Sequence, residues 1–135
     1  MRRKLLLTCV LAASWSLALA EVTYAQAPKA AGGAWVGRWY FGTASVCRAK
    51  PERGRGGEQG LRVYTTSMAY GYDNKCAIKK VTLRGAGVDV VQSCRGEGEE
   101  WTETEYLEVV DGKLKLTAEV EGKRKTYTFN RCPAG

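Results

Sequence analysis

The residues with the clearest capacity for chemistry are two glutamates, Glu103 and Glu105, two positions apart in a segment of alternating residues. In an extended strand this spacing places both carboxylates on one face, and glycoside hydrolysis uses such a pair. The chain has no histidine, which removes the imidazole base and the Ser-His-Asp type of triad. A domain of this size can hardly form a sugar cleft, so we interpret both glutamates as solvated. We predict that the protein has no catalytic residues and is not an enzyme.

These glutamates belong to an acidic segment between Gly96 and Gly112, which holds seven acidic residues and no lysine or arginine. The residues of this segment that could contact a partner are Glu97, Glu99, Glu100, Trp101, Glu103 and Glu105. Such a concentration of negative charge could dock a cationic partner or hold calcium. The alternative is a solvated surface paired with lysines on neighbouring strands, and the sequence alone favours it. Calcium is the weaker reading, because the Asp and Asn ligands of a recognised calcium loop are missing.

A second charged feature is a glycine-rich loop from Arg48 to Gly60. Its candidate anion-binding residues are Arg48, Lys50, Arg53 and Arg55. They could bind anionic glycans, lipid headgroups or nucleic acid. The favoured interpretation is a mobile solvated loop, because no aromatic residues stand between the arginines as stacking platforms. Nucleic acid is not expected as a partner.

Four cysteines follow residue 20, namely Cys47, Cys76, Cys94 and Cys132. No two are close in sequence and there is no histidine, so disulfides are favoured over a zinc site. A turn at residues 85–87 would place Cys76 beside Cys94 on adjacent strands. Cys47 would then meet Cys132 where the first and last strands close a barrel. We predict these two disulfides, with no metal and no cofactor.

The chain begins with Arg2, Arg3 and Lys4, continues with an apolar run and reaches small residues at Ala18-Leu19-Ala20. This layout is typical of a secretory signal, and the run is too short to be a membrane span. We predict a signal peptide at 1–20, a flexible leader at 21–33 and a periplasmic or secreted location. Removal of residues 1–20 lowers the net charge from +7 to +4.

The remaining residues, 34–135, alternate with period two in most segments, which predicts a single all-β domain. The expected strands lie at 34–41, 61–66, 76–83, 88–94, 101–110, 114–120 and 123–131. A β-bulge is expected near Lys79 and Lys80, where the apolar positions change parity. Asp111-Gly112 is the strongest hairpin signal. Short connections favour a disulfide-bonded antiparallel meander or barrel of six to eight strands.

The run Trp35-Val36-Gly37-Arg38-Trp39, together with Arg131 near the end, resembles the calycin pattern of a first-strand Gly-x-Trp packed against a late arginine. Lipocalins, avidins and small bacterial metalloprotease inhibitors share that architecture, so the resemblance implies a barrel that binds something. The Trp-x-Gly-x-Trp start and the four cysteines are also similar to a group of small exported proteobacterial proteins without assigned function.

Together, these features predict a non-catalytic periplasmic or secreted binding module, with inhibition of a secreted hydrolase as one form of that role. The partner would be a protein or a small ligand in the periplasm. The alternative is a small-ligand carrier that uses the barrel interior. A large apolar cavity would favour the carrier, whereas a filled interior with protruding charged loops would favour the protein-binding module.

Overall fold

A computed structural model describes residues 33–135, which form eight β-strands and two short 3-10 helices. The elements are β1 (Gly37–Tyr40), η1 (Ala44–Arg48), η2 (Pro51–Arg53), β2 (Leu61–Tyr64), β3 (Met68–Tyr70), β4 (Asn74–Arg84), β5 (Gly87–Gly96), β6 (Glu99–Val110), β7 (Lys113–Val120) and β8 (Lys123–Arg131). The predicted signal peptide at 1–20 and the predicted leader, except for its last residue, lie outside the described residues.

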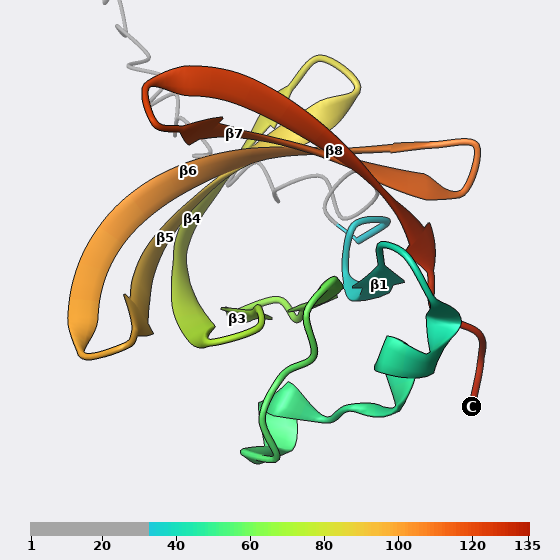
Figure 1. The fold of residues 1–135 in the computed structure, drawn as a ribbon. Helices are drawn as coiled ribbons and strands as arrows, with labels where there is room; N and C mark the ends of the chain where they lie inside the picture. Colours follow the sequence, from blue (N-terminus) through green and yellow to red (C-terminus); the bar gives the residue numbers. More distant parts are fainter. Residues whose placement is uncertain (1–32) are drawn as a thin grey trace, which may run out of the picture.

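The strands form a closed antiparallel barrel in chain order, β1 to β8. The last strand returns to the first, with Trp39 opposite Arg131. Long, strongly curved strands from β4 to β8 make one wall, and the short strands β1 to β3 complete the circle (Figure 1). The all-β barrel is therefore confirmed, at the upper end of the predicted range of six to eight strands.

Two details of the strand prediction need correction. The structure adds β3, whose three residues are too few to produce a recognisable alternation. The first strand is shorter than predicted, so Trp35 and Phe41 lie outside it. The predicted bulge is confirmed, because the register between β4 and β5 shifts between Ile78 and Lys80.

Three tight hairpins connect β5 to β8, and each turns on a residue pair with positive φ. At Asp111-Gly112 the φ angles are 51° and 73°, and Glu97-Gly98 and Glu121-Gly122 repeat the arrangement. Such turns match the right-handed twist of the strands they join, and glycine at the second position adopts positive φ without steric cost. The hairpins fix the register of the long wall, and therefore which side chains face the interior.

Apolar side chains from both walls form most of the buried core. The largest fully buried ones include Trp39, Leu107, Leu114 and Leu116. At one end, Trp35 is 4% exposed and meets the Tyr64 ring edge-on, with ring centroids 5.9 Å apart. The Trp35 carbonyl also accepts a 2.8 Å hydrogen bond from Trp39 Nε1. We call this the Trp35 end of the barrel.

Arg131 completes the Trp35 end. Its guanidinium carbon lies 4.0 Å from the centre of the Trp39 ring, and its Nη2 donates to the Ala34 carbonyl at 2.8 Å. A Cβ atom on Gly37 would lie only 2.7 Å from Arg131 Nη1, and Gly37 has a φ of 142°. Only glycine suits this position. The contact implied by the resemblance to calycins is therefore present.

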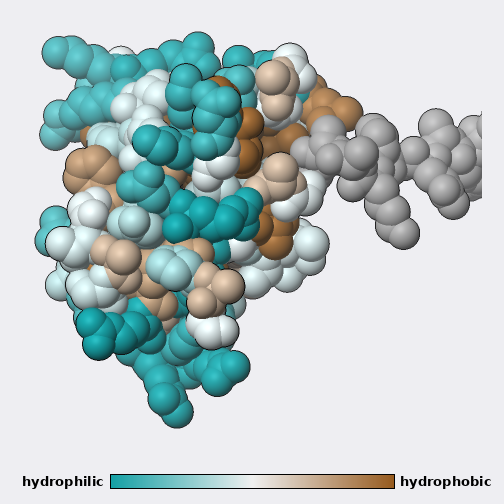
Figure 2. All heavy atoms as spheres, turned by 90° about the vertical axis from the view of Figure 1, so that its right-hand side faces the viewer, coloured by the Kyte–Doolittle hydropathy of each residue, from teal (hydrophilic) through white to brown (hydrophobic). Residues whose placement is uncertain are grey.

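Both predicted disulfides are present, Cys47–Cys132 and Cys76–Cys94. The first ties η1 to the segment after β8, and the second links directly opposed residues of β4 and β5. Hydrophilic side chains cover most of the face shown in Figure 2, whereas hydrophobic ones gather toward one edge. Among residues 33–135, no helix has the length and apolar character needed to span a bilayer.

Candidate functional site

The end of the barrel opposite Trp35 gathers four connections, at residues 41–60, 71–73, 97–98 and 121–122. A cleft of about 440 Å³ lies at this end, and we call this the cleft end. Its lining comprises Tyr72, Asp73, Asn74, Gly96, Glu97, Glu99 and Trp101. Three of the residues predicted to contact a partner, Glu97, Glu99 and Trp101, are therefore brought together.

The inner face of β6 leads from this cleft toward the core. Glu99, Trp101, Glu103, Glu105 and Leu107 alternate along one face of the strand, since successive side chains point to opposite sides. Their partners on β5, in the same order, are Gly96, Cys94, Gln92, Val90 and Val88. The interior is therefore polar near the cleft and becomes apolar deeper inside.

The prediction that Glu103 and Glu105 are solvated is wrong. Glu105 is 1% exposed and Glu103 is half-buried. Both stand at the same parity as Leu107, so the alternation that buries Leu107 also turns the glutamates inward. That shared parity was the available signal in the sequence.

Glu105 is held by two residues of β2. The Tyr64 hydroxyl donates to Glu105 Oε2 at 2.7 Å, and Arg62 Nη2 lies 3.3 Å from Glu105 Oε1. Burial raises the pKa of Tyr64 well above its usual value, and the Glu105 carboxylate raises it further. Burial lowers the pKa of Arg62, but the nearby Tyr64, Glu105 and Glu103 outweigh that effect and raise it. Arg62 therefore stays charged and compensates Glu105.

Glu103, one step closer to the cleft, has different partners. Gln92 Nε2 donates to its Oε1 at 2.8 Å, and Trp101 Nε1 donates to its Oε2 at 2.9 Å. Both donors are neutral, and within residues 33–135 no lysine or arginine nitrogen lies within 4.0 Å of this carboxylate. Gln92 is fully buried, and its carbonyl oxygen Oε1 has no hydrogen-bond partner. This region contains a carboxylate without a close cation and an unused acceptor.

Sequence reasoning missed Arg62, Tyr64 and Gln92. Gln92 shares the parity of the buried Val88 and Val90, which was a usable signal. On β2 the pattern is misleading, because the apolar residues of the alternation are Leu61 and Val63. In the barrel Arg62 lies opposite Trp39, on the inner face, whereas Val63 lies opposite Arg38, on the outer face.

The other predicted partner residue, Glu100, lies away from the cleft lining. It forms an exposed ion pair with Arg95 on β5, with Arg95 Nη2 2.6 Å from Glu100 Oε1. The predicted acidic surface is thus divided by strand alternation. Glu97 and Glu99 line the cleft, Glu103 and Glu105 face inward, and Glu100 faces outward.

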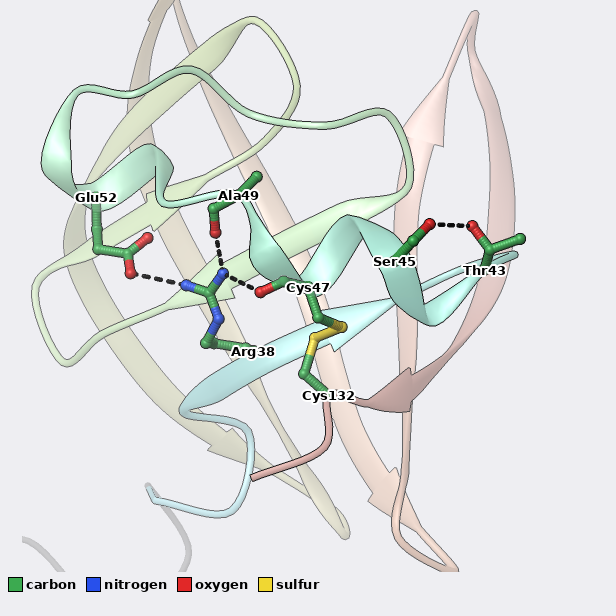
Figure 3. The surroundings of a disulfide bond; sticks show 7 residues. All are labelled: Arg38, Thr43, Ser45, Cys47, Ala49, Glu52 and Cys132. Atoms are coloured by element: carbon green, nitrogen blue, oxygen red, sulfur yellow. Dashed lines mark hydrogen bonds and ion pairs between the residues drawn. A yellow bond between two sulfur atoms is a disulfide. The ribbon is translucent and has the colours of Figure 1, made fainter. Parts of the chain in front are cut away.

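The predicted basic loop is anchored to the barrel by Arg38 of β1. Its guanidinium donates to the Glu52 carboxylate at 2.7 Å, to the Cys47 carbonyl at 3.0 Å and to the Ala49 carbonyl (Figure 3). The loop therefore begins at the end of η1, contains η2 and is held against β1, rather than being an unstructured stretch. Of the predicted anion-binding residues, Arg48, Arg53 and Arg55 are exposed and Lys50 is half-buried.

The sulfur atoms of Cys76 and Cys94 lie near a Glu103 oxygen, with these ligand-type atoms all within 4.8 Å of one another. Both sulfurs belong to one disulfide, and a metal needs thiolates. Metal ligation here would require reduction of that bond.

The chain matches no protein-family model, no curated protein and no solved structure in the comparisons made. The properties of its cleft end are therefore the basis on which a function can be proposed.

Proposed function

We propose that this protein is a non-catalytic binding module of the periplasm or the extracellular space, and that a protein partner docks at its cleft end. The supporting observation is the contrast between the two ends of the barrel. At one end Trp35 borders a hollow of about 180 Å³, whereas at the other Glu97, Glu99, Trp101 and Tyr72 line a cleft of about 440 Å³. A cleft lined by both aromatic and charged residues is typical of a recognition surface.

The contacts of the two inward glutamates support a non-catalytic role. In a retaining or inverting glycosidase, one carboxyl protonates the leaving group while the other acts as nucleophile or base. Glu105 is fully buried and already bound by Arg62 and Tyr64, so it lies beyond the reach of a polymeric substrate. The two disulfides are consistent with an oxidising compartment.

The filled interior favours a protein partner over the carrier alternative. Leu107, Leu114 and Leu116 occupy the space that a carrier would keep for its ligand. The cleft lies at the rim, where a side chain projecting from a protein can enter it. A secreted hydrolase inhibited in this way is one such partner.

Affinity capture from periplasmic extract and culture medium tests the proposal. The test variant is Glu97→Lys with Glu99→Lys, and the matched control is Glu100→Lys with Glu119→Lys, which makes the same charge change away from the cleft. We expect the test variant to lose the retained partner while the control keeps it. Capture by the wild type should also weaken with salt, because the rim charges are exposed.

Two results would overturn the proposal. One is a partner that is retained by the cleft variant and lost from the control. The other is hydrolysis of a polysaccharide or peptidoglycan panel that Glu103→Gln abolishes, which would make the protein an enzyme.

A further inference from the structure

We propose that the cleft end binds a primary ammonium group, supplied by a lysine side chain of the partner, and that Glu103 and Gln92 are its binding residues. This inference rests on the proposed function and specifies the chemistry that the cleft recognises. Glu103 was interpreted from the sequence as solvated, whereas the barrel places it on the inner face of β6.

The first observation concerns charge. Of the two inward carboxylates, Glu105 has Arg62 at 3.3 Å, whereas the hydrogen-bond donors to Glu103 within residues 33–135 are the neutral Gln92 and Trp101. Carboxylates withdrawn from water are normally paired with a cation, because desolvation of an unpaired charge is costly. Arg62 acts on half-buried Glu103 only from beyond ion-pair distance, so a second cation could still pair directly with this carboxylate.

The second observation is independent of charge. Gln92 is fully buried, and its Oε1 has no partner although its Nε2 contacts Glu103 Oε1 at 2.8 Å. A buried amide oxygen without a partner is destabilising, and only a hydrogen-bond donor can satisfy it. At the cleft, Asn74 Oδ1 is a second buried oxygen without a partner. Within residues 33–135, this region thus holds two buried acceptor oxygens without donors, next to a carboxylate that has no ion-pair partner within 4.0 Å.

The free acceptor oxygens and the Glu103 carboxylate suit the ammonium group of a lysine better than the guanidinium group of an arginine. Both oxygens of Glu103 already accept a hydrogen bond, one from Gln92 and one from Trp101. The carboxylate therefore does not have two free oxygens for a bidentate pair with an arginine guanidinium. An ammonium is a compact charge whose three donors point in different directions. Glu103 and Gln92 lie behind the residues that line the cleft, and Trp101, which lines it, donates to Glu103. Its ring can also lie against the alkyl stem of a lysine.

The test uses n-butylammonium, which has the length and charge of a lysine side chain, with butanol, butyrate and butylguanidinium as matched probes. The readout is the NMR signal of the Trp101 indole N–H, assigned with Trp101→Phe. We expect n-butylammonium to shift this signal saturably, while butanol and butyrate leave it unchanged and butylguanidinium binds more weakly.

Two variants probe the site residues. Glu103→Gln removes the charge at nearly constant shape and should weaken n-butylammonium binding about tenfold or more. Gln92→Leu removes the unpaired acceptor and should weaken it as well, so the inference stays testable if one variant does not fold. Glu108→Gln, which changes a glutamate of the same strand on the outer face, should leave binding unchanged.

An affinity that Glu103→Gln leaves intact would overturn the inference, as would equal responses to n-butylammonium and to sodium chloride at the same ionic strength. Loss of this inference leaves the proposed function testable, because partner capture depends on the rim residues Glu97 and Glu99. If the free amine binds but a lysine-blocked, acetylated partner is still captured, the ammonium comes from a small amine and the lysine assignment is wrong.

Discussion

Replacement of Arg62 by methionine tests whether Glu105 is kept in the barrel as an ion pair. Arg62 Nη2 lies 3.3 Å from Glu105 Oε1, and the side chains are 24% and 1% exposed. Without Arg62, the buried carboxylate retains only the hydrogen bond from Tyr64. Loss of one partner of a buried ion pair costs about 3–5 kcal/mol. Since water reaches part of Arg62, we expect a loss of stability below that range, about 2–3 kcal/mol.

Urea unfolding followed by tryptophan fluorescence measures the effect. With a urea m-value of about 1–1.5 kcal/mol/M for a domain of this size, the midpoint should fall by about 2 M. The double variant Arg62→Met with Glu105→Leu should recover much of the loss, because an apolar pair can replace a buried ion pair. A double variant as unstable as the sum of its single variants would refute the ion-pair reasoning, as would a single-variant loss below about 0.5 kcal/mol.

Two other predictions follow from the interior contacts. Tyr64→Phe should cost about 1.5–3 kcal/mol near pH 7, because it removes a hydrogen bond to a carboxylate. The pKa of Tyr64 is raised in the folded state, so its stabilising effect is present below pH 10 and is lost as the pH rises further. Unfolding curves should therefore show a smaller wild-type advantage at pH 11, and an advantage that grows there would contradict the assignment. Gly37→Ala should lower the free energy of unfolding by about 1–3 kcal/mol and displace Arg131 from the Trp39 ring. Gly85→Ala should lower it by less, because nothing lies within 4 Å of the added Cβ. Thermal unfolding of both variants measures the difference, and equal losses would show that the close approach of Arg131 has no effect.

The long wall of the barrel could be predicted from the sequence because its signals are local. Each hairpin from β5 to β8 combines alternation in both strands with a turn pair that ends in glycine, as at Asp111-Gly112. Register then follows from the turn, and the opposition of Cys76 and Cys94 follows from the turn between β4 and β5. The disulfide pairing was predictable for the same reason.

The short wall was harder to predict. Where residues on both faces of a strand are buried, hydrophobicity does not indicate which face points into the barrel. Leu61 and Val63 are both buried, which reads as a core-facing pattern, yet Val63 is on the outer face opposite Arg38. Arg38 holds the η1–η2 segment against β1, so apolar side chains on the outer surface can be covered by the chain itself. Alternation of apolar and polar residues indicates which side chains are buried, but not whether they are buried in the barrel interior or beneath a loop on its outer surface.

The polar interior could not be derived from alternation alone, because charged residues are normally assigned to the solvent side of a strand. Glu105 can lie inside the barrel because Arg62 and Tyr64 of β2 contact its carboxylate. Tyr64 is 41 residues earlier in the chain than Glu105. Only the closed barrel brings these strands together. The same closure leaves Glu103 beside two neutral donors and the unpaired oxygen of Gln92. Glu105 is thus paired with a cation from within the fold, whereas Glu103 has no ion-pair partner among residues 33–135.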